Sequence, residues 1–214
     1  MNTPFTPKFT RSLLALCCSL GWGAQLASAQ SSMDSNSSSG ATSNAPAAAS
    51  KMGANLPASK PTDAQIMKII QAVNDNEIEA AKMAEKQASS RDVKSFARDM
   101  EKEHTRMNRD GDMLGKKLKM SPEESAMSAE IKTMGKTEAE QLKTANRENF
   151  DKTYIDLQAA GHEKVLGIFD SSLLPNVKNP ELKANLEAAR KHVAEHMVHA
   201  QKVQSALSKS ASAK

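Results

Sequence analysis

Four stretches of this chain repeat apolar residues at alternating steps of three and four, and this spacing limits the fold more than any other feature of the sequence. Such steps place side chains on one face of an α-helix, and their alternation is typical of packed antiparallel helices. Only 3% of the 214 residues are aromatic, which argues against a β-sandwich or an α/β core. We expect four bundle helices, at about 63–88, 91–118, 148–173 and 180–207.

A fifth helical segment is expected between the second and third bundle helices. Residues 121–124 (Ser-Pro-Glu-Glu) are a helix start signal, and a weaker apolar face extends from Met127 to Leu142. A helix ending near residue 144 would be about 36 Å long and would cross the whole bundle, so that the second and third bundle helices run parallel. The sequence therefore predicts an all-α fold, a ferritin-like four-helix bundle with a long helical crossover between the second and third helices.

The N-terminal part of the chain has the pattern of an export signal. Lys8 and Arg11 precede an apolar run, and residues 27–29 (Ala-Ser-Ala) form a cleavage pattern, so we expect a signal peptide at 1–29. The only cysteines, Cys17 and Cys18, fall within it, and the mature protein then has no thiol ligand. The expected location is the periplasm, with association with the outer membrane left open.

The rest of the chain divides into two parts. Residues 30–60 are rich in Ser, Ala and Asn and predict a disordered linker, and residues 61–209 predict the bundle domain. The mature chain has no apolar stretch of membrane-spanning length. Two of the positive charges behind the formal net charge of +4 belong to the signal, and no basic patch is interleaved with aromatic residues, so nucleic acid is not expected as a partner.

Each of the four stripes is interrupted near its middle by one titratable residue. These residues are Glu77, His104, His162 and His196. At 1.5 Å per residue, their heights along the expected helices agree within about 5 Å. We therefore expect one carboxylate and three imidazoles to meet in one buried layer of the bundle.

This layer has two interpretations, and both stay open at this point. Three neutral imidazoles and one carboxylate can bind one ion of iron, zinc, manganese or copper, at about 2.0–2.2 Å. In that case Glu103, Glu163 and Glu195, each next to a histidine in sequence, are candidates to orient a histidine of a neighbouring helix. Alternatively, Glu77 beside a protonated histidine satisfies both charges without a metal, and the layer serves only packing.

Other candidate sites are weaker. Glu101-x-x-His104 has the spacing of di-iron carboxylate bundles, but a di-metal site needs a second copy of the motif. Met100 and Met107 around His104 suit copper(I), although core packing is the favoured interpretation. His192 and His199 are expected at the bundle boundary, either solvated or as a surface ladder for metal ions.

Several short motifs of the chain are similar to those of one bacterial family. These motifs lie at 63–65, 76–79, 93–100, 103–104, 150–154, 160–164 and 195–197. Through them, residues 62–207 resemble an exported, ferritin-like domain of unknown function, sometimes labelled a predicted outer-membrane protein. Glu103 stands where the family usually has Asp before the second-helix histidine. The resemblance implies a ferritin-like bundle in the periplasm or envelope and brings no established activity.

Two functions from different classes follow from the sequence. The leading hypothesis is a periplasmic binding protein that holds one metal ion in the His/Glu layer. The alternative is a structural or stress-related envelope protein that binds a partner and uses the layer only for packing. A metal-dependent oxidase is a third and weaker hypothesis. No phosphate-binding glycine loop, Ser-His-Asp order or cysteine motif is visible in the sequence.

Overall fold

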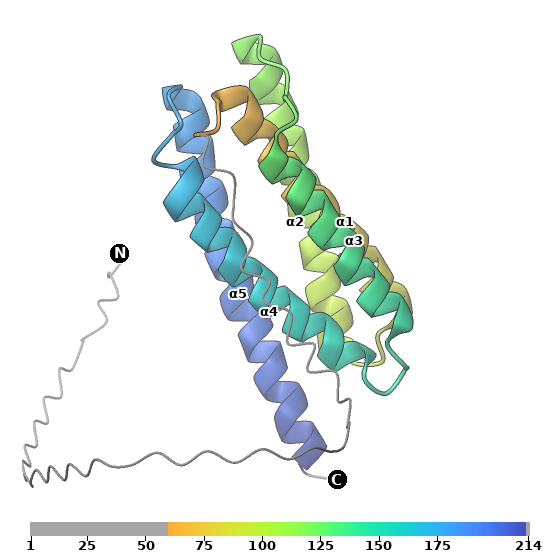
Figure 1. Cartoon of the computed structure of the whole chain (residues 1–214). Helices are drawn as coiled ribbons and strands as arrows, with labels where there is room; N and C mark the ends of the chain where they lie inside the picture. The colour runs from red at the N-terminus through yellow and green to blue at the C-terminus, as the bar shows by residue number, and fades with distance from the viewer. Residues whose placement is uncertain (1–59, 213–214) are drawn as a thin grey trace, which may run out of the picture. The chain divides into compact units, whose positions relative to one another are not determined.

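The computed structural model describes residues 60–212, which contain α-helices, one short π-helical segment and no β-strand (Figure 1). The predicted signal peptide lies outside the described residues, as does the predicted linker up to residue 59. The all-α prediction is confirmed. The elements are α1 (Asp63–Gln87), α2 (Arg91–Leu118), α3 (Ala126–Thr144), α4 (Phe150–Ile168), η1 (Phe169–Leu173) and α5 (Pro180–Ser212).

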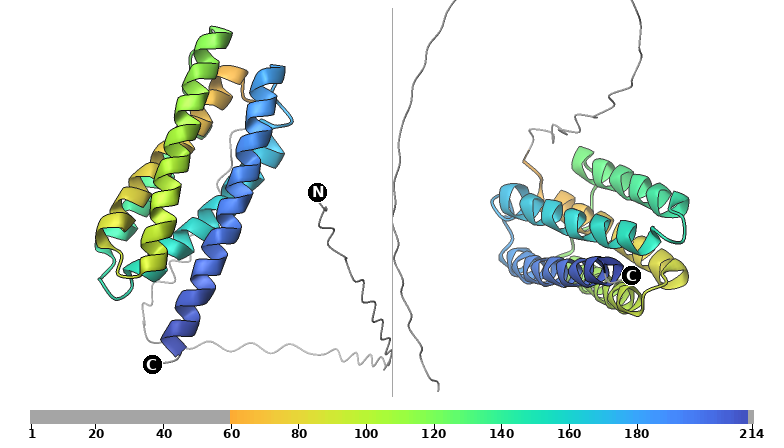
Figure 2. Two further views of the ribbon diagram at one scale, coloured as in Figure 1. Left: turned by 180° about the vertical axis from the view of Figure 1, so that it is seen from behind. Right: turned by 90° about the horizontal axis from the view of Figure 1, so that it is seen from below.

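The helices form two antiparallel pairs joined by the crossover α3. α1 packs against α2, and α4 packs against α5, while α2–α5 and α1–α4 contacts join the pairs. α3 packs along α1 and also touches α4, and Figure 2 shows α2 and α3 on opposite sides of α1. Because α3 carries the chain back along the bundle, α2 and α4 run in the same direction (Figure 1). The predicted ferritin-like bundle with a long helical crossover is therefore confirmed.

The crossover helix begins later than the sequence suggested. Its N-cap is Ser125, whose Oγ accepts a hydrogen bond from the Ser128 backbone N–H at 3.1 Å, while the Ser128 Oγ accepts from the Ser125 N–H at 2.8 Å. The preceding segment is held against α1, because the Glu123 N–H donates to the Ala64 carbonyl at 3.0 Å. The expected start at residues 121–124 was therefore wrong by a few residues, but the 19-residue helix is still about 28 Å long.

The expected third bundle helix, 148–173, is also modified. Regular α-helix ends at Ile168 and is followed by the π-helical segment η1, in which the Leu174 N–H donates to the Phe169 carbonyl at 2.9 Å. The wider turn brings both Phe169 and Leu173 into the core, each 1% exposed. At the other end of the bundle, α5 begins with Pro180 at its first position, as predicted, and its length exceeds the expected 180–207.

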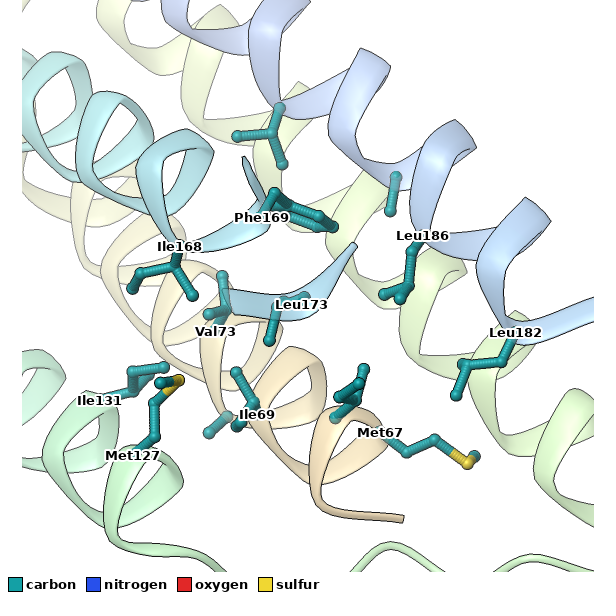
Figure 3. Close-up of a cluster of buried hydrophobic side chains, with 14 residues drawn as sticks. Met67, Ile69, Val73, Met127, Ile131, Ile168, Phe169, Leu173, Leu182 and Leu186 are labelled. Carbon is teal, nitrogen blue, oxygen red and sulfur yellow. The ribbon is translucent and has the colours of Figure 1, made fainter. Parts of the chain in front are cut away.

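A layer of polar residues divides the hydrophobic core into two clusters. The first cluster, drawn in Figure 3, includes Ile69, Phe169 and Leu186, and the second includes Phe96 and Ile155. On every bundle helix, residues of one cluster are separated from residues of the other by buried polar side chains. These are Asn74 and Glu77 on α1, His104 on α2, Gln158 and His162 on α4, and His196 on α5.

α3 lies unusually close to α1 at the height of this layer. A Cβ atom added at Gly135 would lie 2.1 Å from the Asn76 Cγ, and the Asn76 side-chain amide donates to the Ile131 carbonyl at 2.8 Å. A larger residue at 135 would displace the Asn76 amide from this hydrogen bond, so a glycine is favoured where α3 packs on α1. Within residues 60–212, no helix combines the length and apolar character that crossing a membrane requires.

The second cluster makes the effect of a core charge testable. Val93 is 0% exposed, so Val93→Asp buries an unpaired carboxylate and should destabilise the fold by about 3 kcal/mol or more. Ser95→Asp, on the exposed side of the same helix turn, should change stability by less than about 0.5 kcal/mol. Thermal melts followed by circular dichroism measure both variants, and equal melting temperatures would contradict the observed core.

Candidate metal centre

Three of the four predicted site residues meet at one point inside the bundle. His104 comes from α2, His162 from α4 and His196 from α5, and their side chains offer ligand atoms that all lie within 4.8 Å of one another. The ring centroids are 5.2 Å apart for His104–His196, 5.5 Å for His162–His196 and 5.9 Å for His104–His162. The three residues are only 1 to 5% exposed. One histidine from each of three helices therefore contributes to a closed triangle of rings.

The protonated nitrogen of His104 is determined by a chain of amides that begins at the surface. The exposed Asp75 carboxylate accepts a hydrogen bond from the Asn108 Nδ2 at 2.8 Å, so the Asn108 Oδ1 faces the other way and accepts from the Asn74 Nδ2 at 2.9 Å. The Asn74 Oδ1 is then left to accept from the His104 Nδ1 at 2.9 Å. Because a carboxylate at the start of this chain only accepts, His104 carries its proton on Nδ1.

The other two rings are oriented by acceptors of a different kind. The His162 Nδ1 lies 2.8 Å from the Gln158 backbone carbonyl, which can only accept, so this nitrogen is protonated. The His196 Nε2 lies 2.7 Å from the Glu103 carboxylate of α2 and donates to it. Glu103 therefore orients a histidine of a neighbouring helix, the role for which it was a candidate.

The remaining nitrogen of each ring has no hydrogen-bond partner among the described residues. These atoms are the His104 Nε2, the His162 Nε2 and the His196 Nδ1, and all three are buried. Since the opposite nitrogen of each neutral ring carries the proton, each of these atoms presents a lone pair. Three lone pairs cannot satisfy one another, and unsatisfied buried polar atoms are rare in folded proteins. The arrangement can bind a cation through three nitrogen ligands and leave further coordination positions open.

The electrostatic environment favours the neutral form of His104 and His196. Burial lowers the pKa of His104 well below its usual value, and the neighbouring histidines lower it further. Burial also lowers the pKa of His196, although the hydrogen bond to Glu103 opposes the shift. For Glu103, burial raises the pKa but the hydrogen bond and charge of His196 lower it more, so its net pKa lies below the usual value. The layer therefore contains neutral imidazoles with an ionised acceptor behind one of them.

Glu77 is buried in the same layer but is not a member of the histidine group. It is 7% exposed, and its Oε2 has no hydrogen-bond partner among the described residues. Its negative charge acts on His196, where it favours the protonated form. That Glu77 is a metal ligand stays a prediction.

The weaker candidates have other partners. Glu101 forms an ion pair with Lys82 at 3.7 Å, and its side chain is 35% exposed. The His192 Nδ1 lies 3.5 Å from a Glu195 oxygen at the edge of the layer, and the His199 ring packs at 5.0 Å on Phe96. Glu163 is exposed.

The two methionines flanking His104 belong to opposite halves of the core. Met100 is 1% exposed in the second hydrophobic cluster, whereas Met107 packs against the first. Core packing thus accounts for both.

Sequence reasoning missed the residues that orient His104 and His162. The acceptor for His162 is the backbone carbonyl four residues earlier, which any residue at position 158 would supply, so the identity of Gln158 carries no signal for it. Asn74 and Asn108 are 34 residues apart and come from different helices, so no local pattern connects them.

A comparison with models of protein families shows to which family the chain belongs. A family model described as domain of unknown function (DUF4142) matches residues 45–203. The chain belongs to the DUF4142 family. The resemblance seen in the sequence is thereby confirmed, and the match includes all the residues of the histidine layer.

The fold is also found in a solved structure, described as CopM in the Cu(II)-bound form. The two chains have a TM-score of 0.53 and 16% sequence identity, over 70% of this chain and 99% of that chain. At this identity the likeness shows the fold alone. A comparison with curated proteins finds no match.

The buried histidines should make the stability of the metal-free DUF4142 protein depend on pH. Because burial lowers the folded-state pKa of His104 and His196, the unfolded chain binds protons that the folded chain does not. Above the unfolded-state pKa of about 6.5, both states are neutral and the free energy of unfolding is unaffected. Below it, protonation stabilises the unfolded chain, and the free energy of unfolding falls by at most about 1.4 kcal/mol per pH unit for each histidine. Melts in EDTA from about pH 7.5 to about pH 5 measure this slope.

Two variants test whether the pH dependence of stability comes from the histidine layer. His104→Gln should flatten it, whereas His199→Gln, outside the triangle, should leave it unchanged. A wild-type melting temperature that rises on acidification over this range would show that the rings are not held neutral by burial.

Proposed function

We propose that this protein binds one transition-metal ion through His104, His162 and His196. The observation that carries the proposal is the set of three buried lone pairs, on the His104 Nε2, His162 Nε2 and His196 Nδ1, that converge without any hydrogen-bond partner among the described residues. In each ring the other nitrogen donates to a fixed acceptor, which is the usual outer arrangement around metal-binding histidines.

The charges around the layer suit a divalent ion. Neutral imidazoles contribute no charge, while the carboxylates of the buried Glu77 and the partly exposed Glu103 together can offset two positive charges. Glu77 remains the proposed fourth ligand, since one of its oxygens lacks a partner among the described residues.

The ligand set narrows the choice of metal. Imidazole nitrogen suits copper, zinc and iron, whereas manganese prefers oxygen ligands. Copper is the first ion to test, because a protein with this fold is seen in a Cu(II)-bound form. The near-complete burial of the three histidines favours retention of an ion over turnover of a substrate, so binding is proposed rather than catalysis. The predicted signal peptide supports a periplasmic location for this binding.

Metal titrations of the purified chain test the proposal. The wild type should bind one equivalent of Cu(II) or Zn(II), and each of His104→Leu, His162→Leu and His196→Leu should lower the affinity by at least about 100-fold, because the three ligands act as one site. Metal at about 100 times its Kd should stabilise the wild type by about 2.7 kcal/mol and should not stabilise these variants. Elemental analysis and melts with metal or EDTA provide the measurements.

Matched variants separate the ligands from their surroundings. His199→Gln should retain the site, and Glu103→Gln should weaken it by about 10- to 100-fold without removing it. Glu77→Gln tests the fourth-ligand prediction alone. A wild type that stays metal-free after supplementation, with a melt indifferent to copper, zinc, iron and manganese, would leave the layer with a packing role in an envelope protein.

A further inference from the structure

A second group of buried atoms, all oxygens, lies in the polar layer on helices α1 and α4. The Glu77 Oε2, the Tyr154 hydroxyl and the Gln158 Oε1 are buried and have no hydrogen-bond partner among residues 60–212. Tyr154 is 0% and Gln158 2% exposed. Such atoms require a donor, an ordered water or a cation, because an unsatisfied buried acceptor costs about 1–3 kcal/mol.

Helix geometry places these oxygens together. Tyr154, Gln158 and His162 follow one another at intervals of four on α4, so all three side chains lie on the face that is turned to the layer. Glu77 comes from α1, which packs against α4. The group therefore lies directly beside the histidine triangle, displaced along α4 toward the second hydrophobic cluster.

The crossover helix adds a second carboxylate. The Asn76–Ile131 hydrogen bond and the close approach at Gly135 fix α3 against α1, and the Lys164 Nζ contact with the Met134 Sδ at 3.1 Å fixes it against α4. One turn beyond Met134 stands Glu138, which is half-buried. Glu138 lies seven residues after Ile131 and four before Leu142, so it shares the buried face of α3 with both, and Leu142 belongs to the cluster that contains Tyr154. Burial raises the pKa of Glu138 to about 7, and the charge of Glu77 adds to this effect.

The hydroxyl of Tyr154 supplies a hydrogen-bond donor. Burial, together with the charge of Glu77, raises the pKa of Tyr154 well above its usual value, so its hydroxyl keeps its proton. Because this hydroxyl has no partner among the described residues, it can donate a hydrogen bond to a carboxylate of the site rather than act as a ligand.

From this arrangement we infer that Glu77, Glu138 and Gln158 form a second site, for a hard divalent cation of the Mn²⁺ class, with Tyr154 as the residue that positions the carboxylates. Two carboxylates and an amide oxygen are the ligands that such cations prefer, whereas the histidine triangle offers only nitrogen. The two sites differ in ligand type and share at most Glu77, so the oxygen site stands whether or not the nitrogen site binds metal.

Titration of the full chain with Mn²⁺, followed by electron paramagnetic resonance, tests the inference. The wild type and His162→Leu should each bind one Mn²⁺ at the oxygen site, since this site does not use the imidazoles. Glu138→Gln should lower the Mn²⁺ affinity by at least about tenfold, and Tyr154→Phe should lower it by a smaller factor without changing the stoichiometry. Glu140→Gln, an exposed carboxylate on the same helix, is the matched control and should bind as the wild type does.

Thermal melts distinguish a loss of Mn²⁺ binding from a folding defect. Glu138→Gln removes a half-buried carboxylate whose charge opposes Glu77, so the metal-free variant should melt no lower than the wild type, and Mn²⁺ should raise the melting temperature of the wild type and of His162→Leu more than that of Glu138→Gln. Absence of Mn²⁺ binding in the wild type would overturn the inference, as would wild-type affinity in Glu138→Gln. Mn²⁺ binding that is lost in His162→Leu and kept in Glu138→Gln would place the ion at the histidines and also overturn it. Failure of the histidine proposal shows separately, as Cu(II) or Zn(II) binding that the histidine variants do not change.

Discussion

Three imidazole lone pairs directed into one buried space set the main constraint on this bundle. They require three helices to bring one histidine each to the same height, and each ring must in turn meet an acceptor behind it. These acceptors come from an amide on α1, a backbone carbonyl on α4 and a carboxylate on α2. A slip of one helix by a single turn would move its histidine about 5.4 Å away from the other two rings. For His104 and His196 it would also separate the ring from its acceptor, which lies on another helix. The layer therefore fixes the register of the helices more strictly than the two apolar clusters can, because apolar contacts have no comparable direction.

The separation of the core into two clusters follows from the same layer. Apolar packing on either side excludes water, which lowers the pKa of His104 and His196 and strengthens the hydrogen bonds within the layer. α3 completes the enclosure because Gly135 allows it to approach α1 closely. The crossover, which in principle only returns the chain to the other end of the bundle, also carries the half-buried Glu138, a carboxylate of the proposed oxygen site. Fold and candidate chemistry depend on the same close helix contact.

Much of this could be predicted from the sequence, for physical reasons that differ among the elements. The helices and the convergence of His104, His162 and His196 follow from a local period, since a titratable residue at the centre of an apolar stripe must face the core. The start of α3 was misplaced because Ser125 and Ser128 cap each other, a local contact that competes with the Pro122 signal. The break in α4 at Phe169 depends on packing against other helices and has no strong local signature. Asn74, Asn108 and Glu138 reach the layer through contacts between helices, and a single-helix pattern does not contain that information.

The amide chain behind His104 connects the surface of the molecule to its most buried ring. Its outer end is the exposed carboxylate of Asp75, which can only accept hydrogen bonds. The amide nitrogens of Asn108 and Asn74 therefore both donate toward the surface, and their oxygens both face the interior. A basic residue in place of Asp75 would favour the opposite orientation of Asn108 and then of Asn74. The His104 Nδ1 would face an amide N–H, and the proton would move to Nε2, the atom that points into the triangle. The ligand set of the interior is thus specified in part by the charge of one solvent-exposed side chain.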